Sequence, residues 1–84
     1  MTGYRRPPDL AVFEDGSTVY AAHLPDGPIV VLDGVAGLIW AEACAGPTAT
    51  IVDRVAAMTD ATADDIRAEV ESFVAHLVHR GLLV

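Results

Sequence analysis

Lysine is absent from this 84-residue chain, and five arginines are its only fixed positive side chains. Twelve Asp and Glu residues outnumber them, so the formal net charge is −7. A surface of this charge repels the phosphates of nucleic acids and anionic lipids instead of releasing their counterions. The composition therefore predicts that neither nucleic acid nor a membrane is a partner.

Cysteine and long apolar runs are also scarce. Cys44 is the only cysteine, which excludes an intrachain disulfide and a Cys-x-x-Cys metal or redox pair. No apolar run approaches the roughly 18–20 residues that span a bilayer, and no apolar segment of a signal peptide follows Arg5 and Arg6. We therefore expect one small soluble domain in the cytoplasm, held together by its hydrophobic core alone.

The first third of the chain has the pattern of a β-meander. Residues 1–9 contain Pro7 and Pro8 and are expected to form a flexible tail. Three runs of β type follow, and two turn signals separate them, Asp15-Gly16 and Pro25-Asp26-Gly27. These signals predict a three-stranded antiparallel sheet with strands at 10–14, 18–24 and 28–32.

The pattern then becomes helical. Asp33 is expected to cap a first helix that ends before Gly46-Pro47. Within this helix Trp40 is predicted to lie at a partly buried edge of the core. A second, short helix is expected to open at Thr48 or Thr50.

The third helix has the clearest pattern. Thr62 is its expected N-cap and Gly81 its expected stop, with Asp64 and Asp65 in the first turn, where they complement the helix dipole. Its apolar residues recur at helical spacing: Ile66, Val70, Phe73, Val74, Leu77 and Val78. The apolar segment 82–84 after it is expected to pack against the domain. The predicted class is α+β, winged helix-turn-helix-like, with the three-stranded antiparallel sheet followed by three helices.

Four segments in this order carry a family resemblance: Ile29-Val-Val-Leu-Asp-Gly-Val-Ala-Gly-Leu-Ile-Trp40, Ile51-Val-Asp-Arg-Val55, Ala63-Asp-Asp-Ile-Arg-Ala-Glu-Val70 and Phe73-Val-Ala-His-Leu-Val-His-Arg-Gly-Leu-Leu83. Residues 10–84, taken as a single domain, resemble the PqqD-like proteins. These are also called RiPP recognition elements, which bind the leader peptides of ribosomal peptide natural products. As a stand-alone copy the chain is most similar to the leader-binding protein of split lasso peptide systems, in which a leader peptidase and a cyclase act on the presented precursor.

The resemblance implies a site as well as a fold. In that family the leader adds as a further antiparallel strand to the edge of the third strand, and its side chains enter a cleft beside the third helix. Carried over to this sequence, the edge is Pro28, Ile29, Val30, Val31 and Leu32, and the helix wall comes from Arg67, Val70, Phe73, Val74 and Leu77. Lasso leaders in such systems carry Tyr-x-x-Pro, which implies an apolar pocket of aromatic size, with Val70 and Phe73 as its walls.

The residues themselves leave two interpretations open. The run 29–32 has no charge before Asp33, which suits either the addition of a peptide strand or a fully buried strand. The apolar stripe of the third helix is first of all core. Its acidic residues form either a solvated face or a surface that steers a basic leader: Asp64, Asp65, Glu69 and Glu71.

No residues are arranged for catalysis or for holding a cofactor. His76 and His79 lack the further ligands that a metal site needs, and Cys44 has no partner base. We therefore expect a non-catalytic adaptor that holds a precursor leader without metal or cofactor. The alternatives are a winged-helix DNA-binding regulator, which would need more Arg and Lys on the third helix, and a purely structural subunit.

Overall fold

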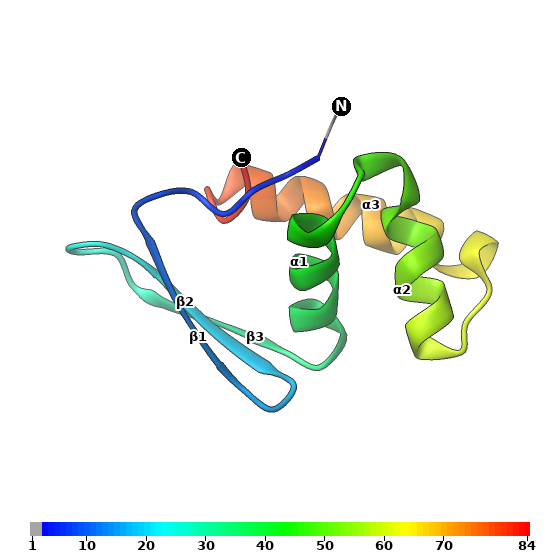
Figure 1. Ribbon diagram of the computed structural model, residues 1–84, viewed down its shortest axis with the longest axis horizontal. Coiled ribbons are helices and arrows are strands. Elements are labelled where there is room, and N and C mark those ends of the chain that lie inside the picture. The colour runs from blue at the N-terminus through cyan, green and yellow to red at the C-terminus, as the bar shows by residue number, and fades with distance from the viewer. Residues whose placement is uncertain (1–2) are drawn as a thin grey trace.

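The computed structural model describes residues 3–84 and consists of a small sheet followed by helices (Figure 1). The elements in chain order are β1 (Leu10–Asp15), β2 (Thr18–His23), β3 (Ile29–Asp33), α1 (Val35–Ala45), a 3₁₀ turn η1 (Thr48–Thr50), α2 (Ile51–Thr59) and α3 (Ala63–His79). The predicted α+β class, with three strands before three helices, is confirmed. Helix α1 packs beside the sheet, α2 and α3 pack against α1 and each other, and α3 passes behind α1 and α2.

The sheet is an antiparallel meander with β2 in the middle. Tyr20 of β2 lies between Phe13 of β1 and Val31 of β3 in one cross-strand row. Side chains alternate between the two faces of a sheet, so this row lies on one face, and Phe13, Tyr20 and Val31 are all exposed there. The opposite face packs against the helices through four buried side chains: Leu10, Val19, Ala21 and Leu32.

The turn from β3 into α1 differs from our expectation. Asp33 does not cap α1; it ends β3, and its Oδ1 accepts a hydrogen bond from the Thr18 hydroxyl at 2.8 Å. The N-cap is Gly34, at φ 59° and ψ −124°, a backbone conformation that glycine alone adopts without strain. This sharp turn brings α1 close to the sheet, since a Cβ on Gly37 would lie 2.9 Å from the Leu32 carbonyl oxygen.

Trp40 lies in the middle of the core, not at its edge as the sequence suggested. Its side chain is 1% exposed, and its Nε1 donates a hydrogen bond to the Leu82 carbonyl oxygen at 3.0 Å. The chain reaches this position because Gly81, at φ 75°, turns it back after α3. Leu82 and Leu83 are each 1% exposed, which confirms the expected packing of the C-terminal segment for these two residues.

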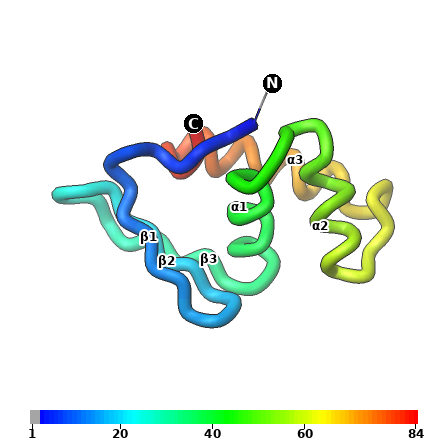
Figure 2. The backbone as a smooth tube through the Cα atoms, in the orientation of Figure 1, coloured from blue at the N-terminus to red at the C-terminus, as the bar shows by residue number. Residues whose placement is uncertain are grey.

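Residues 3–9 lie against the body of the protein, where we expected a free tail. Arg5 and Val84 exchange two main-chain hydrogen bonds, of 2.8 and 2.9 Å. The Arg6 guanidinium lies 5.5 Å from the centroid of the Trp40 ring, and Tyr4 packs against the core. Figure 2 shows this N-terminal segment running beside the C-terminal end. The two ends of the described chain therefore close the core together.

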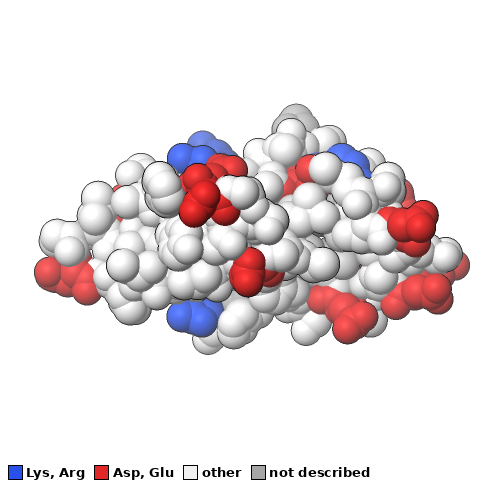
Figure 3. Space-filling view, turned by 90° about the horizontal axis from the view of Figure 1, so that it is seen from below, with Lys and Arg blue, Asp and Glu red and all other residues white. Residues whose placement is uncertain are grey.

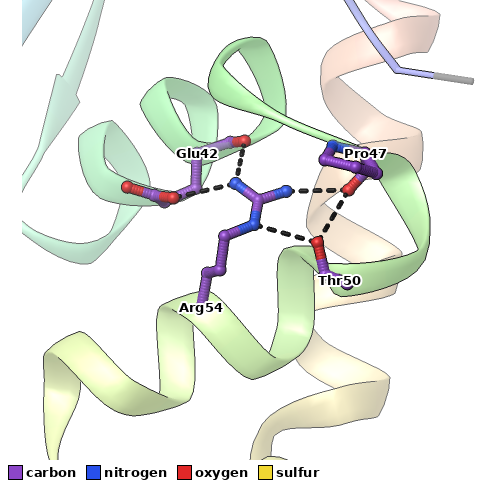
Figure 4. A network of polar contacts seen from close by, with 4 residues as sticks. All are labelled: Glu42, Pro47, Thr50 and Arg54. Atoms are coloured by element: carbon purple, nitrogen blue, oxygen red, sulfur yellow. Dashed lines mark hydrogen bonds and ion pairs between the residues drawn. The ribbon is translucent and has the colours of Figure 1, made fainter.

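One arginine organises the corner between α1 and α2 (Figure 4). Arg54 Nη1 donates to the carbonyl oxygen and to Oε1 of Glu42, at 2.7 and 2.8 Å, and Nη2 donates to the Pro47 carbonyl oxygen at 2.7 Å. Its Nε donates to the Thr50 hydroxyl, and Thr50 occupies the N-cap position of α2, as one of the two expected starts. The guanidinium thus supplies donors to carbonyl groups that the end of α1 leaves free.

The ends of α3 agree with the sequence. Thr62 occupies its N-cap position, although its side chain makes no capping hydrogen bond, and the helix stops two residues before Gly81. Of the predicted apolar stripe, Val70, Val74 and Leu77 are buried, whereas Val78 is 40% exposed and only partly covered.

Candidate functional site

The outer edge of β3 carries main-chain groups without a strand partner among residues 3–84. Which residues point outward follows from the hydrogen-bond phase of the sheet. Leu24 N–H donates to the Asp9 carbonyl oxygen at 2.8 Å, and these two residues are opposite one another when the β1–β2 register is extended by one position. Antiparallel pairs alternate between bonded and non-bonded, so Val19 and Ala21 of β2 bond toward β3.

Val30 and Leu32 are the register partners of Ala21 and Val19, so their N–H and C=O groups are used inside the sheet. The groups of Ile29, Val31 and Asp33 therefore point away from β2. We call these outward-facing groups the β3 edge. Ile29 is 71% exposed and Val31 54% exposed, so an approaching peptide would meet no side chain packed over them.

The far end of the β3 edge leads to an apolar cavity between the helices. The α1–α3 cavity has a volume of about 450 Å³. It is lined by Val35, Ala36, Ile39, Val55, Thr59, Ala61, Ile66, Glu69, Val70 and Phe73. Val35 is one of these lining residues and follows Asp33 after a single residue, so the cavity begins near the C-terminal end of the β3 edge.

Two of the five predicted helix residues line this cavity. Val70 is 3% exposed and forms its floor, while Phe73 is half-buried and has its ring 6.2 Å from that of His76. Phe73 therefore combines an apolar surface toward the cavity with access to solvent, which suits contact with a peptide side chain.

The other three do not form part of the cavity. Arg67 and Val74 line a separate hollow of about 300 Å³ on the far side of α3, next to Tyr4. Arg67 Nη2 lies 3.7 Å from Asp64 Oδ1, and both side chains are exposed. Leu77 is 1% exposed and belongs to the core. The predicted helix wall is thus divided between two hollows that lie on either side of Val70, which lines both.

The cavity also has walls that the predicted site left out. Ile66 and Glu69 come from α3, and Val35 and Ile39 come from α1. Ile66 is one helical turn before Val70, so the apolar period of α3 contained a signal for it. The α1 residues had no such signal, because α1 is apolar on all sides and the sequence does not say which side faces α3.

The one thiol of the chain lies in surroundings that lower its reactivity. Burial raises the pKa of the Cys44 thiol, and the Arg6 guanidinium lowers it by a smaller amount, so this thiol stays protonated near neutral pH. Within residues 3–84, no three His, Cys, Asp or Glu side chains are placed to hold a metal ion. No helix in this part of the chain is long and apolar enough to cross a membrane.

Comparison with known proteins gives one solved structure and one family. The structure described as TbiB1 in complex with the TbiA(beta) leader peptide superposes with a TM-score of 0.80 at 21% sequence identity, over 94% of this chain and 93% of that one. Curated proteins give no significant match. The family described as coenzyme PQQ synthesis protein D (PqqD) matches residues 18–83. This match extends from the start of β2 to the buried C-terminal segment, and the chain belongs to the PqqD family.

Proposed function

We propose that this protein binds the leader region of a ribosomally made precursor peptide, of the lasso type, by adding it as a strand to the β3 edge. The observation that carries the proposal is the unpaired β3 edge beside an apolar cavity. An added strand receives main-chain hydrogen bonds from the edge and specificity from pockets for its alternate side chains. The similar fold of TbiB1, which was solved with a leader peptide, supports this mode.

The expected contacts follow from the phase of β3. An antiparallel leader would exchange main-chain hydrogen bonds with Ile29, Val31 and Asp33, while Pro28 has no N–H to offer. Val30 and Leu32 would contribute through packing. The tyrosine of a Tyr-x-x-Pro leader would enter the α1–α3 cavity against Val70 and Phe73.

The role we propose is that of a non-catalytic adaptor in the cytoplasm. It would hold the precursor by its leader and present the remainder to a maturation peptidase and cyclase. Such tethering raises the effective concentration of substrate at the enzyme.

The DNA-binding alternative has no support in the structure. In a winged-helix reader a recognition helix offers basic side chains to the major groove. Here α3 begins with Asp64 and Asp65, and its basic residues other than histidine are reduced to Arg67, which faces Asp64. A surface of this charge would repel the DNA backbone.

Fluorescence polarisation tests the proposal. A labelled lasso-type leader with Tyr-x-x-Pro should bind, its Tyr→Ala version should bind at least about tenfold more weakly, and a labelled DNA duplex should not bind. Equal binding of both leaders would overturn the cavity assignment. A response to the duplex alone would restore the regulator hypothesis.

A further inference from the structure

The α1–α3 cavity has one charged residue among its ten lining residues. Glu69 lies at its mouth, next to Val70 and one helical turn before Phe73. Its side chain also borders the shallow surface that Ser72, Phe73 and His76 form on the outside of α3. The carboxylate is therefore positioned where a peptide residue beside the cavity would pass.

Glu69 forms no ion pair with a basic side chain within residues 3–84. Residues 3–84 contain three ion pairs, His23–Asp9, Arg54–Glu42 and Arg67–Asp64, and none includes Glu69. Figure 3 shows Asp and Glu side chains gathering at the right-hand end of the molecule, where Figure 1 places the turn from α2 to α3. The surroundings of the cavity thus favour a cation from outside the chain.

Strand direction says which part of a bound peptide approaches Glu69. β3 runs from Ile29 toward Val35 and the cavity. An antiparallel leader runs the opposite way, so its N-terminal part lies at the cavity and its C-terminal part lies at Ile29. Successive side chains of a strand point to opposite faces, so the residue two positions before the side chain that fills the cavity is the one that faces Glu69.

We infer that Glu69 makes the site selective for leaders with Lys or Arg two positions on the N-terminal side of the residue that fills the cavity. This inference rests on the proposed function and names the class of leader that it takes. The cationic group would form a charge-assisted hydrogen bond with the Glu69 carboxylate at the rim. The apolar anchor would fill the cavity beneath it.

The chain offers a matched control in Glu71. It lies two residues away on α3, is exposed like Glu69, and changes the net charge equally when replaced by glutamine. Glu71 lines the hollow on the opposite side of the helix, next to Tyr4. If Glu69 contacts the leader at the cavity, replacing Glu69 will change leader affinity more than replacing Glu71. If the whole acidic surface attracts the leader at long range, the two replacements will have equal effects.

The test uses three labelled synthetic leaders built around Tyr-x-x-Pro. The first carries a single lysine two residues before the tyrosine, the second carries glutamine there, and the third carries the lysine directly after the proline. Each is titrated by fluorescence polarisation against the full-length protein and its Glu69→Gln and Glu71→Gln variants, at low and at high salt. Circular dichroism of the variants checks that the fold is retained.

We expect Glu69→Gln to weaken the first leader by about two- to fivefold at low salt, the range of an exposed ion pair. The effect should shrink at high salt, while the second and third leaders should not distinguish Glu69→Gln from Glu71→Gln. Equal effects of both variants on the first leader, or equal binding of the first and second leaders to the wild type, would overturn the inference and leave the proposed function standing. Failure of all three leaders to bind would overturn both.

Discussion

Val31 and its neighbour Val30 use their main-chain hydrogen-bonding groups in opposite directions. The N–H and C=O of Val31 point outward, whereas those of Val30 bond to Ala21 of β2. Proline lacks the N–H and is tolerated on edge strands where that group faces solvent. The two neighbouring valines therefore give opposite predictions for the same substitution.

Val31→Pro should leave the protein folded and weaken a leader by at least about fivefold, because one main-chain bond to the peptide is lost and the ring obstructs its approach. Val30→Pro, its control, should mainly lower the free energy of unfolding. Urea denaturation followed by polarisation titration measures both quantities. Full leader affinity in a folded Val31→Pro protein would exclude pairing at this edge.

Phe73 and Leu77 are one turn apart on α3 and differ in what lies next to them. Leu77 is 1% exposed, whereas Phe73 is half-buried at the α1–α3 cavity. Phe73→Ala should cost less stability than the about 3–5 kcal/mol of a fully buried phenylalanine, and it should weaken the leader strongly. Leu77→Ala should cost about 2–5 kcal/mol with little effect on the affinity of the protein that remains folded. If Phe73→Ala changes stability alone, Phe73 is core and the cavity does not receive the peptide.

At the scale of elements, the corner between α1 and α2 depends on the side chain of Arg54. Its four hydrogen bonds hold main-chain oxygens of Glu42 and Pro47 together with two side chains. This geometry uses the planar fork of a guanidinium, which lysine does not reproduce.

Arg54→Met should therefore lower the free energy of unfolding by about 1–3 kcal/mol, since the carbonyl and carboxylate oxygens of Glu42 lose a part-buried hydrogen-bond donor. Arg67→Met is the matched control, because Arg67 makes only an exposed pair with Asp64 and should change stability by less than about 1 kcal/mol. Chemical denaturation of both variants measures the loss in the free energy of unfolding. Similar values for the two would mean that the Arg54 network contributes nothing beyond a surface ion pair.

At the scale of the whole molecule, the two ends of the described chain stabilise each other. Arg5 bonds to Val84 through the main chain, and Arg6 covers the ring of Trp40, whose indole bonds to Leu82. The segment before β1 is therefore part of the structure that positions α1 and α3 around the cavity.

Deletion of residues 1–6 should lower the free energy of unfolding by about 2–4 kcal/mol, from two main-chain hydrogen bonds, one cation–π contact and the packing of Tyr4. Arg5→Ala keeps the main-chain bonds and should be nearly neutral. Thermal unfolding compares the two proteins, and amide exchange at Val84 reports the bond directly. A deletion as stable as the full chain would show that the segment does not support the core.

The number, type and order of the elements are predictable from the amino-acid sequence alone. Turn residues and changes of period are local properties, so Asp15-Gly16, Gly46-Pro47 and Gly81 defined boundaries that the structure confirms within one or two residues. The family resemblance was carried by the same local features.

The face that each element turns to its neighbours depends on how the elements pack in three dimensions. The helical period groups Val70, Phe73, Val74 and Leu77, but the packing of α1 and α2 around α3 leaves Phe73 at the cavity, buries Leu77 and directs Arg67 away. The sequence of residues 29–32 likewise does not show which of them form main-chain hydrogen bonds with β2. The alternation of bonded and non-bonded pairs is set by how the strands pair across the sheet. The central position of Trp40 was likewise not predictable, because its hydrogen-bond partner Leu82 is 42 residues away in the sequence. Contacts between residues so far apart follow from the packing of the whole chain and leave no local pattern in the sequence.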